Sequence, residues 1–128
     1  MDEKKLFAFG SENDPIAWKV ADKLNILLPD LKIKKTDNPD ELSIRTQAYI
    51  IILDAARGIE KPTILSIEDL REHHAVTTHD IDLGMTLKLL KKAGKLDESR
   101  VKIIGIPITS RVDDELINNI IRLLKGAK

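Results

Sequence analysis

Cysteine is absent from this sequence, so disulfides, thiol nucleophiles and thiolate metal sites are all excluded. Net charge is absent too, because 21 acidic residues balance 21 basic ones, and no overall field attracts nucleic acid or an acidic membrane surface. No apolar run is long enough to span a bilayer, and "MDEKKLFAFG" lacks the apolar segment of a signal peptide. We therefore expect a cytoplasmic protein that binds neither nucleic acid nor a membrane.

Several well-known catalytic motifs are also missing. The sequence contains no G-x-S-x-G, no phosphate-cradling G-x-x-x-x-G-K-[ST] and no G-x-G-x-x-G. Its serines have no histidine close by in sequence, but this decides nothing, because catalytic triads assemble in space. Any chemistry must therefore come from residues that folding brings together.

The 128 residues fit a single domain, residues 1–128, and their apolar periodicity predicts its elements. Ile16, Val20 and Leu24 recur at helical spacing, with Pro15 suited to the first helical position and Asp14 to the N-cap before it. Strands are predicted at "KKLFAFG", "LKIKK" (an edge strand), "YIIIL", "TILSI" and "RVKIIGIPI", and helices from about His79 onward and at "VDDELINNIIRLLKG". "NPDELSIRT" favours at most a short helix. The predicted core comprises Ile16, Val20, Leu24, Tyr49 to Leu53, Leu83, Leu87, Ile103, Ile104, Ile106, Ile117 and Ile121.

One short connection predicts the topology. Only "AARGIEKP" separates Asp54, where the third strand should end, from Thr63 in the fourth. A parallel crossover needs about a dozen residues or more. The fourth strand should therefore run antiparallel to the third. The expected fold is α/β, a three-layer α/β/α sandwich around a mixed, mostly parallel sheet of about five strands.

Candidate site residues lie where predicted parallel strands end, the usual ligand edge of an open α/β sheet. Asp14 follows the first strand, Asp54 the third, and His79 opens the helix before the last strand. Two carboxylates and an imidazole would suit nickel, zinc or ferrous iron better than calcium or magnesium. Each residue also has a structural interpretation: Asp14 as an N-cap, Asp54 as a turn residue, and His79 as a bystander in a capping box formed by Thr77 and Asp80.

Two other interpretations compete with this site. All three histidines lie in "EHHAVTTH". Glu72, His73, His74 and His79 are therefore candidates for a local metal site. Their spacing fits neither H-E-x-x-H nor a zinc-finger pattern, and a solvated loop is commoner. A phosphoacceptor receiver domain has a similar length and acidic strand ends. It needs a helix between its third and fourth strands and a lysine after its fifth, and "AARGIEKP" and "GIPITS" supply neither.

Four segments, taken in order, carry a resemblance: "FAFGSENDPIAWKVADKL", "IIILDAARG", "TTHDIDLGMTLKLL" and "VKIIGIPIT". Together they resemble the nickel–iron hydrogenase maturation endopeptidases over nearly the whole chain. The resemblance implies a mixed five-stranded sheet between helices, and it implies that Asp14, Asp54 and His79 contact metal. Gly10-Ser11 stands where that family has Gly-Asn, and Pro15 and Ala17 stand where it has glycines. The chain looks like a short or diverged member.

The function implied by the resemblance is proteolysis with an unusual use of metal. The substrate would be the precursor of a nickel–iron hydrogenase large subunit, from which a C-terminal peptide is removed. Nickel would arrive in the precursor rather than reside in the enzyme, and the catalytic set would be Asp14, Asp54 and His79. We expect a monomer. The altered first loop leaves an alternative, a noncatalytic nickel-handling or hydrogenase-assembly protein on the same fold.

Overall fold

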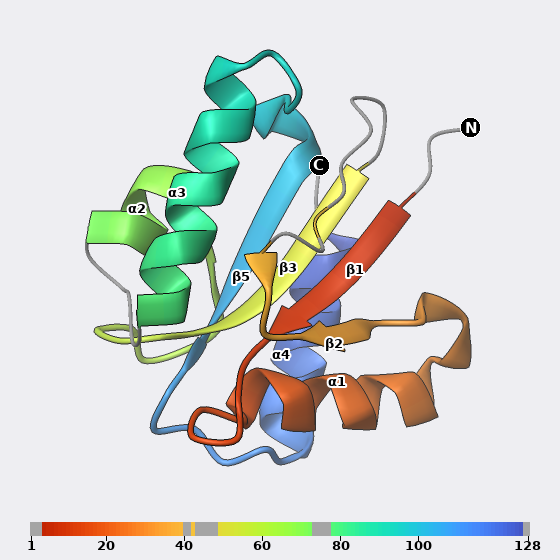
Figure 1. The fold of residues 1–128 in the computed structure, drawn as a ribbon. Helices are drawn as coiled ribbons and strands as arrows, with labels where there is room; N and C mark the ends of the chain where they lie inside the picture. Colours follow the sequence, from red (N-terminus) through yellow and green to blue (C-terminus); the bar gives the residue numbers. More distant parts are fainter. Residues whose placement is uncertain (1–3, 40–41, 43–48, 73–77, 127–128) are drawn as a thin grey trace.

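The computed structural model describes residues 4–39, 42, 49–72 and 78–126, with the backbone but not the side chains of 70–72 and 78–82. Within these residues five strands form one sheet in the order β2-β1-β3-β5-β4 (Figure 1). The strands are β1 (Lys4–Phe9), β2 (Lys34–Thr36), β3 (Tyr49–Ala56), β4 (Thr63–Leu65) and β5 (Val101–Pro107). The helices are α1 (Ile16–Leu27), α2 (Ile67–Glu72), α3 (Thr78–Lys92) and α4 (Asp114–Lys125), with short 3-10 turns η1 (Pro29–Leu31) and η3 (Glu98–Arg100).

The sheet is parallel except at one edge. β1 pairs in parallel with β2 and β3, and β3 with β5, whereas β4 pairs antiparallel with β5. β4 therefore runs opposite to β3, as the short connection predicted, and the described residues 55–62 contain no helix. β2 lies at the other edge, as its lysines suggested. The expected mixed α/β/α sandwich is confirmed.

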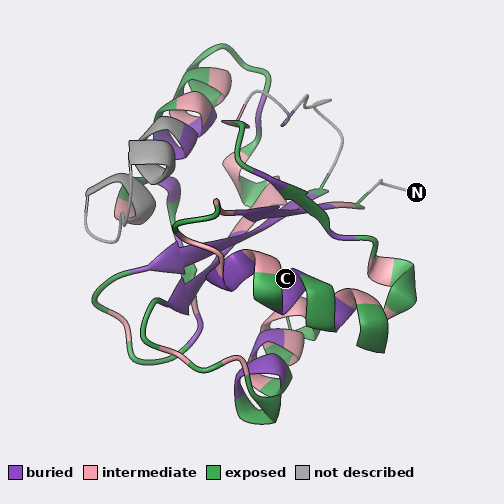
Figure 2. Ribbon diagram, turned by 60° about the horizontal axis from the view of Figure 1, so that its bottom comes forward, coloured by how far each residue is buried: buried purple, intermediate pink, exposed green. Residues whose placement is uncertain are grey.

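Two apolar layers hold the helices against the sheet (Figure 2). Because side chains alternate along a strand, Leu53 and Ala55 face α1 and α4, while Ile52 and Ala56 face α2 and α3. On α3, Leu83 and Leu87 are fully buried in the second layer. The parallel strands, covered on both faces, explain the continuous apolar run in β3.

Four expectations need correction. Tyr49 is 39% exposed rather than core, because it lies at the start of β3 under the guanidinium of Arg100. On α4, Ile120 is fully buried and Ile121 only partly. β3 ends at Ala56 rather than Asp54. "TILSI" is a strand only to Leu65, since α2 begins at Ile67 and was not predicted.

Some of the segments that were interpreted from the sequence lie outside the described residues. This applies to most of "NPDELSIRT" and to Thr77, the first residue of the proposed capping box. In the part of the chain that is described, no helix combines the length and hydrophobicity needed to cross a membrane.

Candidate functional site

The carboxyl ends of the three central parallel strands meet at one edge of the sheet. Register pairing aligns Phe9 of β1 with Asp54 of β3, and Asp54 with Gly105 of β5. The first loop, residues 10–15, leaves this edge, and α3 begins on the same side of the molecule (Figure 1). The predicted ligand edge is therefore formed by these segments.

The first loop is a tight turn closed by two backbone hydrogen bonds between Ser11 and Asp14. The backbone N–H of Ser11 donates to the carbonyl of Asp14 at 3.1 Å, and the N–H of Asp14 donates to the carbonyl of Ser11 at 3.1 Å. A Cβ atom on Gly10 would lie 2.8 Å from the Asp14 carbonyl oxygen, so only glycine allows this closure. The turn fixes the backbone that carries Asp14.

The predicted N-cap role of Asp14 is wrong. α1 begins at Ile16, its N-cap is Pro15, and no side chain makes a capping hydrogen bond there. The reason is the preceding turn, which uses the backbone of Asp14 to pair with Ser11. Because the carboxylate does not cap the helix, capping does not explain why an aspartate stands at position 14.

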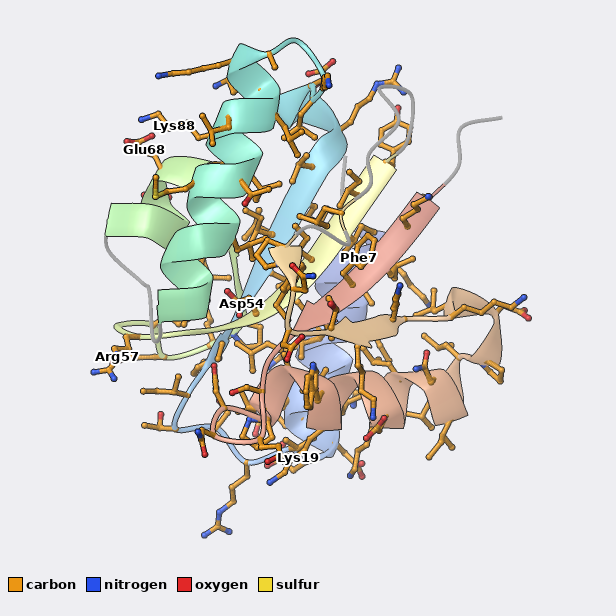
Figure 3. The ribbon with its side chains drawn as sticks, in the orientation of Figure 1. Phe7, Lys19, Asp54, Arg57, Glu68 and Lys88 are labelled. Carbon is orange, nitrogen blue, oxygen red and sulfur yellow. The ribbon has the colours of Figure 1, made fainter. Side chains whose placement is uncertain are left out.

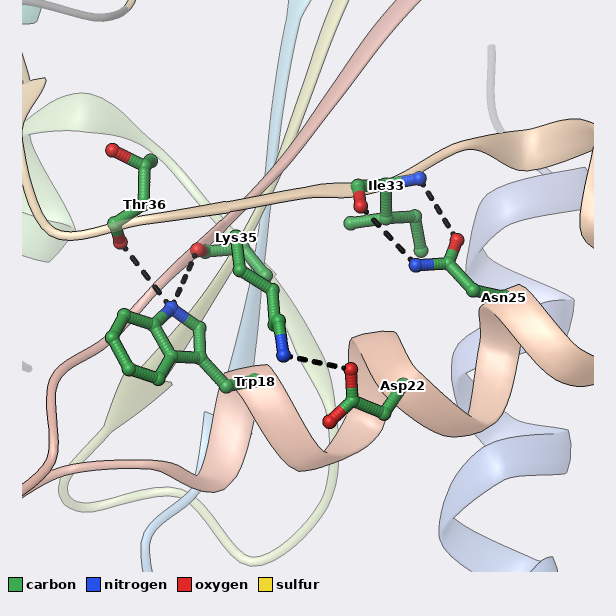
Figure 4. Close-up of polar contacts among 7 residues, drawn as sticks. Trp18, Asp22, Asn25, Ile33, Lys35 and Thr36 are labelled. Carbon is green, nitrogen blue, oxygen red and sulfur yellow. Dashed lines mark hydrogen bonds and ion pairs between the residues drawn. The ribbon is translucent and has the colours of Figure 1, made fainter.

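Trp18 ties α1 and the first loop to the sheet. Its indole Nε1 donates to the carbonyl oxygens of Ala8 at 3.1 Å and Thr36 at 3.3 Å (Figure 4). The N–H of Gly10 also donates to the Thr36 carbonyl, at 3.1 Å. These bonds join β1, β2 and α1 where the loop begins. They therefore help to fix the backbone position of Asp14 relative to the sheet.

Two further contacts brace the outer part of α1 (Figure 4). The side chain of Asn25 makes two hydrogen bonds with the backbone of Ile33. Its Oδ1 accepts from the Ile33 N–H at 2.9 Å, and its Nδ2 donates to the Ile33 carbonyl at 3.2 Å. Lys35 forms an exposed ion pair with Asp22 at 2.9 Å. The amide pair positions β2 against α1, whereas an exposed ion pair contributes little.

Asp54 is a buried carboxylate, only 1% exposed. It lies inside β3 rather than in the turn after it, and its side chain shares the α3 face of the sheet with Ile52 and Ala56 (Figure 3). Burying a carboxylate costs free energy unless hydrogen bonds or opposite charge compensate it. The burial of Asp54 within a strand therefore rules out the interpretation of this residue as an exposed turn residue.

Asp14 lines a cleft of about 720 Å³ at the same edge. Three exposed basic residues line this cleft from three segments: Lys19 of α1, Arg57 of the turn after β3, and Arg111 of the loop before α4. Ser110 adds a hydroxyl, and Asn13, Pro15, Ile16, Ile108 and Val112 complete the lining. Asp54 is not part of that lining, so the cleft does not unite the two carboxylates. No motif in the sequence predicted a role for these cations, although Arg57 and Arg111 both closely follow strand ends.

The third candidate, His79, lies in the first turn of α3, and its side chain is outside the described ones. Among the described side chains, no group of three or more His, Asp or Glu residues is arranged to hold a metal. The shared metal site of Asp14, Asp54 and His79 thus stays a prediction. His73 and His74 lie outside the described residues, so the local histidine site is equally untested.

Comparisons with known proteins support the fold. No family model and no curated protein matches the sequence. Among solved structures, the hydrogenase maturating endopeptidase HybD from E. coli is similar, with a TM-score of 0.67 and 16% sequence identity. The match covers 98% of this chain and 91% of HybD. The resemblance found in the four sequence segments therefore extends to the whole architecture, and this chain has a HybD-like hydrogenase maturation endopeptidase fold.

Proposed function

We propose that this protein is an endopeptidase that removes a C-terminal peptide from the nickel-loaded precursor of a nickel–iron hydrogenase large subunit. One observation carries the proposal: nearly the full chain shares its fold with a hydrogenase maturating endopeptidase. Fold alone does not assign activity, because one fold hosts many functions. Activity would depend on the residues at the carboxyl edge of the sheet.

Helix spacing supports pairing Asp54 with His79. Position 79 precedes Leu83 by four residues and Leu87 by eight, so all three positions share one row of α3. Leu83 and Leu87 pack into the layer on the face of the sheet that carries Asp54. The row starts at the end of α3 nearer the carboxyl edge (Figure 1). This placement favours contact of Asp54 and His79 with the same ligand.

The chemistry follows from that donor set. Carboxylates of Asp14 and Asp54 and the imidazole of His79 would contact the nickel of the incoming precursor and hold the scissile bond beside it. A water molecule deprotonated by one carboxylate would then attack the scissile carbonyl. No side-chain nucleophile is required.

The charge of the cleft supports nickel as part of the substrate. Three basic side chains and one carboxylate, that of Asp14, are the charged groups among its described lining. Such a lining is less favourable for a free divalent cation than for a metal whose charge is already offset by the ligands of its own protein. An empty precursor would lack the metal contacts that position its scissile bond, so nickel loading would gate cleavage. We propose that the reaction occurs in the cytoplasm and that the enzyme acts as a monomer.

A noncatalytic nickel-handling or hydrogenase-assembly role is the alternative. It is favoured by the first loop, where Gly10-Ser11 and Pro15 depart from the family pattern. Both functions would retain binding of the precursor, and only the enzyme would shorten it. Peptide release therefore separates them.

The test uses purified protein and the large-subunit precursors encoded by the same genome, each prepared with and without nickel. The mass of the large subunit after incubation reports cleavage. Loss of a C-terminal peptide from the nickel-loaded form alone supports the proposal. Binding without any change in mass supports the assembly role, and cleavage that ignores nickel contradicts the substrate-metal mechanism. Asp54→Asn should abolish release, whereas Asp22→Asn, which alters only an exposed ion pair, should not.

A further inference from the structure

The charge of the cleft beside Asp14 is at odds with the charge of the chain. The whole sequence is neutral, yet the charged lining of this cleft is three cations and one carboxylate. The cations Lys19, Arg57 and Arg111 come from three separate segments that meet only in the folded protein. Figure 3 shows Lys19 and Arg57 at the end of the molecule where the parallel strands finish. A neutral protein has thus concentrated positive charge at its candidate active edge.

The positive region is local. A neighbouring hollow of about 210 Å³ shares Ser110 and Arg111 with the cleft, and its charged lining is three acids, Glu60, Asp113 and Glu115, against two cations, Lys61 and Arg111. The charged lining is therefore net positive on the Asp14 side of the 110–111 segment and slightly net negative on the other. An anionic group is favoured on the Asp14 side of that segment.

The shape and the remaining lining favour a polypeptide over a small anion. About 720 Å³ is within the range of pockets that hold ligands of several residues' size, and is large for one phosphate or sulfate. Ile108, 39% exposed, and Val112 offer apolar contact beside the charges. A chain segment that carries a carboxylate and an apolar side chain would satisfy both features.

We propose that this cleft binds an acidic segment of the protein substrate, with a carboxylate side chain held by Lys19 and Arg111. The inference rests on the proposed function in one respect, namely that the segment belongs to the hydrogenase precursor. The cleft is a specificity site that has one of the proposed reacting residues, Asp14, in its wall. Lys19 and Arg111 contact the segment and do not take part in bond cleavage.

The binding test compares short fluorescent peptides that alternate alanine with glutamate or alanine with glutamine, measured by fluorescence anisotropy. The glutamate peptide should bind about tenfold more tightly, as two charge contacts allow. The double variant Lys19→Gln, Arg111→Gln should weaken its binding about tenfold. Lys23→Gln with Arg122→Gln is the matched control, because it removes one lysine of α1 and one arginine, here on α4, and neither residue lines the cleft.

Three results would overturn the inference: equal binding of the two peptides, equal loss in the control variant, or displacement of the glutamate peptide by inorganic phosphate at equal concentration. The precursor assay separates this inference from the proposed function. If the double variant releases the C-terminal peptide with an unchanged KM, the endopeptidase stands and the acidic-segment site falls. If acidic peptides bind at the cleft but the loaded precursor is never shortened, the binding site stands and the endopeptidase falls.

Discussion

Asp54 and Gly105 are register partners in the central strand pair β3–β5, so a buried carboxylate has a residue without a side chain beside it. A Cβ atom at Gly105 would lie 2.7 Å from Leu65 Cδ1 and 3.1 Å from Ala56 Cβ. The glycine therefore leaves room for the side chain of Leu65, from the neighbouring strand β4, to pack against β5 and β3.

Gly105→Ala should lower the free energy of unfolding by about 1–3 kcal/mol, because the added methyl overpacks a buried layer. Denaturant unfolding of the variant and the wild type gives this difference. In a Leu65→Ala background the same substitution should cost at least about 0.5 kcal/mol less, since the nearest contact is gone. Equal costs in the two backgrounds would show that Leu65 does not restrict this position.

His79→Ala should keep the wild-type melting temperature and lose peptide release. Leu83 and Leu87 anchor α3 to the sheet, so removing an imidazole from the first turn leaves that packing in place. Calorimetry and the mass of the processed precursor measure the two effects. His73→Ala is the control and should change neither. If His73→Ala abolishes release while His79→Ala does not, the histidine of the site has been assigned wrongly.

Ile120→Ala should destabilise the protein by about 2–5 kcal/mol, whereas Ile121→Ala should cost less than about 2 kcal/mol. Ile120 is fully buried among α1, α4 and the sheet, and Ile121 only packs partly against that layer. Urea midpoints of the two single variants decide between them. A larger loss at Ile121 would mean that α4 is rotated relative to this structure.

Ser99→Ala should raise the pKa of Asp97. The hydroxyl of Ser99 donates to Asp97 Oδ1 at 2.7 Å and its N–H donates at 3.0 Å, which holds the pKa of Asp97 below its ordinary value of 3.8. In the wild type the unfolded chain binds the proton more readily, so this contribution to stability is present above pH 3.8 and is lost as pH falls through the folded pKa.

Carbon-detected NMR titration of the Asp97 carboxyl measures the shift. After Ser99→Ala the pKa should move toward its ordinary value, though not fully, since the backbone bond at 3.0 Å can remain. Ser66→Ala is the control, because that hydroxyl accepts from the N–H of Asp69 in a different part of the surface. An unchanged pKa at Asp97 would remove the hydroxyl as its cause.

The sequence by itself determined most of the elements and the direction of the fourth strand. Apolar periodicity located the helix containing Val20 and Leu24, and a continuous apolar run marked the doubly covered strand β3. The link from 55 to 62 was too short for a parallel crossover, and chain length alone then required an antiparallel strand. Such features are local, and a local pattern is enough to encode them.

Tertiary structure decided the rest. The Ser11–Asp14 turn moved the start of α1 and freed Asp14 from capping, because backbone pairing within the loop competed with the helix end. The burial of Asp54 depends on the strands paired on both of its sides and on the helix layer above it. The basic cleft depends on the strand order, which brings Lys19 and Arg111 to one edge from distant parts of the chain. No pattern read along the sequence encodes that convergence, because it arises only when the strands have paired.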